Sequence, residues 1–363
     1  MTFAKTAGQL TAITLRFISA LLIVASTIGY VASLVLGPIL FFYTTEGLKV
    51  AARGIQEIPL MIFMTVPIAI PIRTDMGSLF ASVWLIFDLC VVAAWYSRGG
   101  FVRALKNALK GPILTVRTNF LFVMPLVATP LLYATVLLQQ FQATQGVQTG
   151  NLTFPPQTSP YVILLNLAFA PINEEIAFRI TSIGIPLAVF LIYRYWNDPK
   201  LTGVSNRAKL LLITMISPER AKASLGYKTV CDRGLLRGIG ALEWILILIT
   251  STAFGLAHFL LGGGWEVGKV STAFLAGLVF GIMFIAYGAY AAILLHWFFD
   301  YYFTVVSLAE STYGGVFHVF SGMVDLTSLI TGEVVLVALL LLWALRFGNY
   351  LSSKAVGQTE LSD

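Results

Sequence analysis

Charged residues are scarce in this sequence. Only 11% of its 363 residues are Asp, Glu, Lys or Arg, whereas soluble domains typically carry about 25%. Hydrophobic residues make up 58%, so a water-soluble fold is excluded. The net charge of +6 is concentrated in one segment, 194–240, and therefore indicates membrane orientation rather than a nucleic-acid partner.

Cysteine is almost absent as well. Cys90 lies in an apolar run and Cys231 in a basic loop, so the chain has neither a disulfide framework nor a cysteine-based metal site. Both are expected to be small buried or loop residues. The first apolar segment, 17–43, lacks a small-residue cleavage site and is too long for the apolar core of a signal peptide. It is therefore expected to be retained.

Long apolar runs, by contrast, recur along the whole chain. Several reach the roughly 20 residues that an α-helix needs to cross the bilayer core. None shows the alternation typical of barrel strands, so the spanning elements are expected to be helices. The predicted fold class is all-α, a polytopic transmembrane bundle of eight or nine helices around a polar cavity: 17–43, 58–71, 77–96, 119–138, 161–193, 241–262, 271–288, 289–309 and 327–347. The uncertain member is 58–71, a short run with three prolines, for which an interfacial or re-entrant position is the alternative.

Basic residues gather in two connecting segments. The segment 194–240 holds nine Lys or Arg against three acids, and 98–110 holds four against none, while 139–160 is uncharged. The positive-inside rule predicts that both basic segments and the tail, 348–363, face the cytoplasm of a cell-membrane protein. The uncharged segment is expected outside, where Asn151 begins a triplet that fits a glycosylation acceptor. The side of the N-terminus depends on whether the short proline-containing run spans the membrane, and it stays open.

The chain divides into three regions. Residues 1–150 are predicted to form N-terminal transmembrane helices without an assigned role, 151–347 hold the candidate site, and 348–363 form the cytoplasmic tail. Within the basic loop, 208–216 predicts a short amphipathic surface helix. The sequence shows no internal repeat and no second soluble domain.

Ionisable residues inside the apolar runs mark the candidate site. A charged group at membrane depth is costly and by default indicates function. Glu175 and Arg179 are four residues apart and share a helix face, whereas Glu174 points about 100° away around the helix. One carboxylate can thus pair with arginine while the other stays free. Pro171 is expected to kink the helix just before the acids and to admit water.

Two of the three histidines also lie in apolar runs. His258 occupies one run, and His296 is followed four residues later by Asp300 on the same helix face. Each feature has a structural alternative, because a Glu–Arg pair can be a salt bridge and a buried histidine a core residue. Together these groups supply a general base, orienting groups and proton donors for hydrolysis by activated water. The remaining isolated ionisable residues are expected in surface, packing or interface roles: Arg16, Asp88 and His318.

The ordered set of motifs resembles a known family. Residues 174–179 read Glu-Glu-Ile-Ala-Phe-Arg, 254–258 read Phe-Gly-Leu-Ala-His, and 296–300 read His-Trp-Phe-Phe-Asp. This pattern is similar to that of the CAAX prenyl protease and bacteriocin-processing (CPBP, or Abi) intramembrane proteases. The similarity covers about 160–310. It implies that the region 151–347 is a CPBP-like protease core.

The resemblance also implies a shape and an activity. The family fold is a helical bundle with a conical, water-accessible cavity that opens toward the cytoplasm. The family activity is hydrolysis near a substrate's C-terminus, as in removal of the last three residues after a prenylated cysteine. By this resemblance Glu174 would be the general base, assisted by His258 and supported by Glu175 and Arg179.

One position departs from the family pattern. His296 and the residue at position 300 would stabilise the oxyanion, yet eukaryotic prenyl proteases carry Asn there, which donates a hydrogen bond that ionised Asp300 cannot. Asp300 would instead orient His296, or join His258 and His296 in holding zinc with water as fourth ligand. Because the sequence has no H-E-x-x-H motif, glutamate catalysis without a metal is preferred over a metalloprotease.

The leading hypothesis is an intramembrane endopeptidase of the CAAX protease type. Its partners would be the lipid bilayer and a hydrophobic or prenylated peptide or protein. The alternatives are a non-catalytic immunity or scaffold protein with the same fold and a proton-coupled transporter. A transporter usually shows two matching halves, which this sequence lacks.

Overall fold

Eight long apolar helices dominate the structure. The computed structural model describes residues 2–111 and 118–359, and within them eight helical spans are long and apolar enough to cross a membrane. They are Ile13–Tyr43, Met76–Gly99, Phe120–Thr144, Pro160–Arg194, Ala241–Leu260, Gly268–Tyr287, Ala289–Tyr313 and Val316–Ala344. Each coincides with a predicted apolar run, so the all-α, multi-pass fold is confirmed.

Six of the spans belong to single helices and two to composite ones. The single helices are α1 (Thr2–Tyr43), α3 (Met76–Tyr96), α5 (Phe120–Thr144), α12 (Ala241–Leu260), α13 (Gly268–Tyr287) and α16 (Val316–Thr359). One composite helix runs from α6 (Pro160–Glu175) through the π-helical segment η2 (Ile176–Gly184) into α7 (Ile185–Arg194). The other runs from α14 (Ala289–Trp297) through π-helical η4 (Phe298–Tyr302) into α15 (Phe303–Tyr313).

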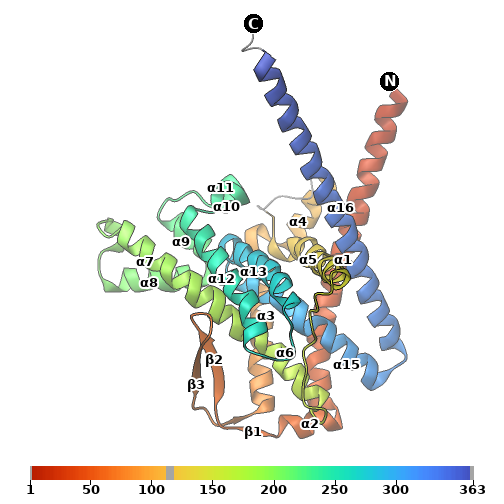
Figure 1. The fold of residues 1–363 in the computed structure, drawn as a ribbon, viewed down its shortest axis with the longest axis vertical. Coiled ribbons are helices and arrows are strands. Elements are labelled where there is room, and N and C mark those ends of the chain that lie inside the picture. The colour runs from red at the N-terminus through yellow and green to blue at the C-terminus, as the bar shows by residue number, and fades with distance from the viewer. Residues whose placement is uncertain (1, 112–117, 360–363) are drawn as a thin grey trace.

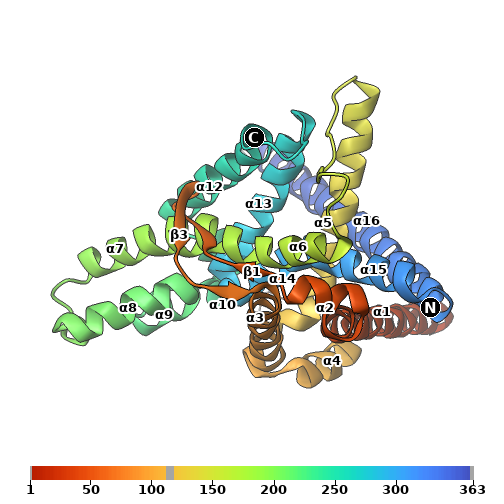
Figure 2. The same cartoon turned by 90° about the horizontal axis from the view of Figure 1, so that it is seen from below.

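Short helices fill the connections. They are α2 (Thr45–Ala51), α4 (Phe101–Lys110), α8 (Val204–Ile216), α9 (Pro218–Ser224), α10 (Val230–Arg233) and α11 (Leu235–Gly238). The predicted amphipathic helix is part of α8, which lies beside α7 (Figure 2). A Cβ on Gly184 would lie 2.8 Å from the Met215 Cα, so only glycine permits this approach. One side of α8 is therefore packed rather than solvated.

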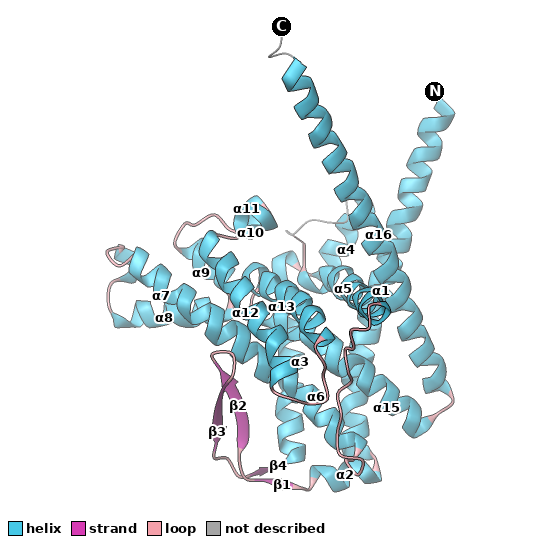
Figure 3. Ribbon diagram, viewed as in Figure 1, coloured by secondary structure: helices cyan, strands magenta, loops and turns pink. Residues whose placement is uncertain are grey.

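The run 58–71 forms a β-hairpin, so the ninth helix predicted there is wrong. Strands β2 (Ile58–Ile62) and β3 (Val66–Ile70) pair antiparallel, and the short strands β1 (Gly54–Ile55) and β4 (Thr74–Asp75) pair at the base of the hairpin (Figure 3). The prolines explain the difference: Pro59 and Pro67 lack the N–H that a helix interior requires, whereas an edge strand tolerates them.

One end of the bundle, called the basic face below, comprises 97–111, 195–240 and the turn at Gly288. Arg98 donates to the Ala286 carbonyl, and its Nη2 lies 3.7 Å from Glu219 Oε1. A Cβ on Gly288 would lie 2.6 Å from the Ile216 carbonyl oxygen, so the α8–α9 junction meets the end of α13 here. In Figure 1, α4, α10 and α11 lie at this end, toward which the outer ends of α1 and α16 also extend.

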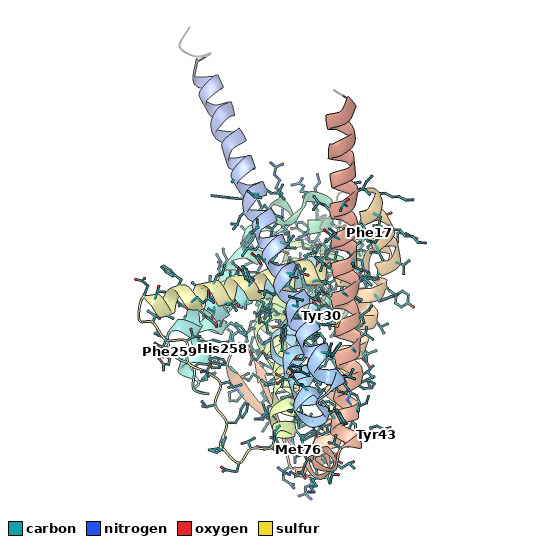
Figure 4. All side chains as sticks on the ribbon, turned by 90° about the vertical axis from the view of Figure 1, so that its right-hand side faces the viewer. Phe17, Tyr30, Tyr43, Met76, His258 and Phe259 are labelled. Carbon is teal, nitrogen blue, oxygen red and sulfur yellow. The ribbon has the colours of Figure 1, made fainter. Side chains whose placement is uncertain are left out.

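The opposite end, called the distal face below, comprises 44–75, 145–159, 261–267 and the α15–α16 turn. Thr44 Oγ1 donates to Tyr161 Oη at 3.0 Å, which holds the start of α6 beside the end of α1. Figure 4 follows α1 from Phe17 through Tyr30 to Tyr43, and Met76, where α3 begins, lies at the Tyr43 end. Helix α5 lies across α1 in the same view. Its C-terminal end reaches the α12–α13 connection, where Gln142 Nε2 donates to the Gly268 carbonyl.

Helix α1 packs against the helix that carries His296 and Asp300. The ring centre of Tyr30 lies 5.1 Å from that of Tyr302, and a Cβ on Gly37 would lie 1.8 Å from Tyr301 Oη. Backbone and aromatic rings thus interlock closely at two levels of α1. The N-terminal helices therefore support η4 directly instead of forming a separate unit.

Candidate active site

Both helices that carry the motif carboxylates become π-helical beside them. The segment η2 begins directly after Glu175, and η4 contains Asp300. Inside η2, the hydroxyls of Thr181 and Ser182 each donate to a carbonyl five residues back, at 2.8 and 2.6 Å. π-Helical turns inside α-helices occur frequently at functional sites. Here they fix the direction of the acids relative to the rest of each helix.

Glu175 and Arg179 form a fully buried ion pair. Arg179 Nη1 donates to Glu175 Oε1 at 2.8 Å, and both side chains are 0% exposed. Arg179 Nη2 donates to the Gly277 carbonyl at 3.1 Å, and the guanidinium lies 4.6 Å from the ring centre of Phe254. The arginine therefore ties the helix of the two glutamates to α12 and α13.

His296 lies among three carboxylates. Its Nδ1 is 2.9 Å from Glu175 Oε1, and its Nε2 is 3.3 Å from Asp300 Oδ2 and 3.7 Å from Glu174 Oε2. The His296 side chain is 5% exposed. Doubly protonated, it donates toward carboxylates from both nitrogens. His296 therefore fixes the relative positions of all three acids.

His258 approaches from α12. Its Nδ1 lies 2.9 Å from the Phe254 carbonyl oxygen, and since a carbonyl only accepts, this nitrogen carries the proton. In the neutral ring Nε2 is then an acceptor. Figure 4 shows His258 at a level between Tyr30 and Met76, within the depth of the bundle.

Three of the six predicted site residues line one cavity. Glu174, His258 and Asp300 border a space of ≈ 330 Å³, near the lower limit of small-ligand pockets. Glu175, Arg179 and His296 lie behind them and do not border it. A smaller neighbouring cavity of ≈ 160 Å³ shares His258 and Asp300 and is also bordered by His296. The six residues therefore form a layer facing the cavity and a buried layer that supports it.

The β2–β3 hairpin is fastened to the glutamate helix. Asn173 Oδ1 accepts from Met61 N at 2.7 Å, Thr181 Oγ1 accepts from Phe63 N at 2.9 Å, and the Ala177 carbonyl accepts from Met64 N at 3.0 Å. Met61 also borders the larger cavity. Sequence reasoning missed this wall. The available signal was Asn173, an amide directly before Glu174 in an apolar run.

Lys269 is a second residue that sequence reasoning missed. It lies in the first turn of α13, borders both cavities, and its Nζ is 3.8 Å from the ring centre of Trp265. The predicted apolar run begins only at 271, so the sequence places Lys269 at the edge of a span and gives no sign that it faces the site.

The predicted zinc ligands do not gather as a ligand set. Across residues 2–111 and 118–359, no group of three or more His, Cys, Asp or Glu side chains is arranged to hold a metal ion. Both nitrogens of His296 face carboxylates, and Nδ1 of His258 is bonded to the Phe254 carbonyl. The described side chains therefore do not fit a zinc site.

The family comparison agrees with the geometry. Residues 156–302 match the family model described as Type II CAAX prenyl endopeptidase Rce1-like. All six site residues fall inside this segment, which extends from just before α6 to the end of η4. The chain therefore carries an Rce1-like domain, and the resemblance to the CPBP family is confirmed. The chain is thus an integral multi-pass membrane protein that contains an Rce1-like domain over residues 156–302. Comparisons with curated proteins and with solved structures found no match.

Proposed function

We propose that the protein hydrolyses a peptide bond of a hydrophobic or lipid-modified substrate with water activated by Glu174. The observation that carries the proposal is the unequal placement of the two adjacent glutamates. The Glu174 side chain is 22% exposed and borders the cavity, whereas Glu175 is fully buried and paired with Arg179 and His296. Glu174 is thus the glutamate that can reach water and substrate.

His258 completes the water site in this proposal. Its neutral Nε2 accepts a hydrogen bond, so a water held between it and Glu174 would have its second proton directed at the carboxylate. Glu174 takes that proton as the hydroxide oxygen bonds to the substrate's carbonyl carbon. When the C–N bond breaks, the same carboxyl returns the proton to the leaving amine.

His296 and Asp300 take different roles from those implied by the family resemblance. Because His296 is buried among carboxylates, we assign it to positioning Glu174 and Asp300 rather than to direct contact with the oxyanion. Asp300 is 26% exposed and borders the cavity, so it orients His296 from the wet side.

We also propose that the basic face lies in the cytoplasm. The segment 98–110 carries four Lys or Arg and no acid, and 194–240 carries nine Lys or Arg and three acids. An excess of basic residues of this kind is typical of cytoplasmic loops. With eight spans, both ends of the described chain fall on that side, consistent with the directions of α1 and α16 (Figure 1).

Replacement of the base tests the proposed reaction. Purified wild type and Glu174→Gln are compared on a prenylated C-terminal peptide and on a library of membrane peptides. Loss of the base should lower kcat/KM by about 100-fold or more. Glu266→Gln is the matched control, because Glu266 is exposed on the distal face, and it should leave activity unchanged.

Two outcomes contradict the proposal in different ways. Full cleavage by Glu174→Gln would remove glutamate catalysis while leaving a protease. Absence of cleavage by the wild type on every peptide would favour the scaffold alternative.

A further inference from the structure

The rim of the active-site cavity is built at the distal face. Three connecting segments contribute its apolar side chains: Met61, Leu152, Phe154, Leu261 and Trp265. Two of the segments are joined by hydrogen bonds, from Thr153 N to Gly263 O and from Glu266 N to Thr149 O, both at 2.9 Å. Among the described residues, none from the basic face borders this cavity. Its opening therefore faces away from the basic loops.

The distal segments carry no excess of positive charge. Segment 44–75 has three Lys or Arg and three acids, 145–159 has no charged residue, and 261–267 has only Glu266. Positive-inside orientation depends on Lys and Arg in short loops close to the membrane. The face that holds the cavity opening is therefore the one expected outside.

We infer that the substrate reaches Glu174 from the extracytoplasmic side. The inference rests on the proposed hydrolase function and names the substrate class. That class is the apolar, extracytoplasmic segment of a membrane protein or lipid-anchored peptide, which fits the apolar rim. The inferred direction of access differs from the family resemblance, which implies a cavity that opens toward the cytoplasm.

Cysteine accessibility in intact cells tests the direction of access without any assay of cleavage. In a Cys231→Ser background, Gln157→Cys places a thiol at an exposed distal position and Ser205→Cys places one at an exposed basic-face position. A membrane-impermeant maleimide should label Gln157→Cys in intact cells and Ser205→Cys only after permeabilisation. The reverse pattern would overturn the inference and leave the Glu174→Gln result unaffected.

A second inference concerns Lys269 and does not depend on orientation. Within the described chain, no carboxylate lies within 4.0 Å of its Nζ, although Glu174 and Asp300 border the same cavity. The stacking of Nζ on Trp265 holds the ammonium at the cavity wall. An ammonium group that makes no direct ion pair in a largely apolar pocket can bind a single anion.

We propose that Lys269 binds a carboxylate of the substrate. A peptide presents that group at its C-terminus or on an acidic side chain. Of the ionisable groups that border the pocket, Glu174 and His258 are assigned to holding water and Asp300 to orienting His296, so Lys269 is the cation left to meet an anionic group of the substrate. Lys269 is then a substrate-binding residue. It selects peptides that have a carboxylate, either at the C-terminus or on an acidic side chain, within reach of the scissile bond.

Paired peptides separate the two carboxylate sources. Wild type, Lys269→Met and Lys269→Arg are assayed on one peptide as free acid, as C-terminal amide, and as amide with an added acidic residue. For the anchored peptide, Lys269→Met should raise KM by about tenfold or more with little change in kcat. Lys269→Arg should retain most of the affinity, because it keeps the charge.

Other results overturn this assignment. If Lys269→Met lowers kcat equally for acid and amide, the lysine only balances the charge of the acids. Binding of the fluorescent acid and amide peptides to Glu174→Gln is measured in parallel, so the comparison does not require turnover. If Glu174→Gln and Glu174→Gln/Lys269→Met each bind the acid and the amide peptide with equal affinity, Lys269 does not bind a carboxylate. This result would hold even if the protein hydrolysed no peptide.

Discussion

At the scale of single residues, two adjacent glutamates have opposite surroundings. Spacing along the helix predicted the Glu175–Arg179 pair, because residues four apart share a face. It could not predict that Glu175 also meets His296, which is 121 residues away and reaches it only through packing of the two composite helices. Likewise, the sequence pointed to His296 and Asp300 as neighbours but gave no hint of Lys269. Local contacts were predictable, whereas contacts made by tertiary packing were not.

Removing Arg179 should destabilise the whole protein. Arg179→Met leaves a fully buried carboxylate facing only His296, and breaking such a pair costs about 3–5 kcal/mol. Chemical denaturation in detergent, followed by tryptophan fluorescence, measures the loss. The double variant Arg179→Met/Glu175→Gln should recover part of it.

Lys49→Met is the control for that experiment. Its ion pair with Glu46 is 62% exposed on both sides, so its removal should change stability by less than about 1 kcal/mol. Equal losses for Arg179→Met and Lys49→Met would show that the buried pair is not a stabilising link between helices.

Asp300→Asn should retain most of the activity, and Asp300→Leu should lose it. In the wild type, His296 Nε2 lies 3.3 Å from Asp300 Oδ2. The amide oxygen of Asn can still accept a hydrogen bond from this nitrogen, whereas leucine removes the acceptor. The kcat/KM of both variants on the same peptide measures the difference. If Asn is as damaging as Leu, the charge itself is required, and elemental analysis of active protein with a chelator titration would then test for a bound metal.

At the scale of elements, apolar runs predicted all eight spans because hydrophobic length is what crossing lipid demands. The same criterion failed at 58–71, where the run is apolar but a hairpin forms. Hydropathy does not distinguish a short apolar helix from apolar strands, and the three prolines were the stronger signal. The π-helical segments were not predictable either, since their register depends on how each helix packs.

Loosening the hairpin should impair substrate binding more than folding. Thr181→Val removes the acceptor for Phe63 N at 2.9 Å and should lower stability by about 1 kcal/mol. The freed hairpin should become more sensitive to limited proteolysis between residues 58 and 70, and KM should rise. Thr252→Val is the matched control, because Thr252 is on an exposed helix face and bonds only within its helix. Identical proteolysis of both variants would show that Thr181 does not hold the hairpin.

At the scale of the whole molecule, helix α1 forms part of the scaffold of the candidate site. The close approach of α1 to η4 depends on Gly37, where a Cβ would lie 1.8 Å from Tyr301 Oη. The sequence left residues 1–150 without a role because their helices carry no motif residue. Their contribution lies in packing, which composition alone does not reveal.

Gly37→Ala should therefore destabilise the fold and reduce activity together. Overpacking of this kind typically costs about 1–3 kcal/mol. Tyr301→Phe in the same chain removes the clashing hydroxyl and should restore part of the loss, as measured by thermal unfolding and by kcat/KM. Gly322→Ala is the control, since a Cβ there meets nothing within 4 Å. A neutral Gly37→Ala would mean that α1 can shift without disturbing η4.

The π-helical winding of η2 makes chemistry separable from membrane insertion. Each residue of a regular helix turns the chain by about 100°. Loss of one codon within η2 would therefore rotate everything after the glutamates while leaving a hydrophobic stretch long enough to cross lipid. Such a variant would keep the hydropathy that insertion requires but would lose the register that pairs Arg179 with Glu175 and seats Gly184 against Met215. The number of residues in this segment, and not only their hydrophobicity, therefore sets the geometry of the candidate site.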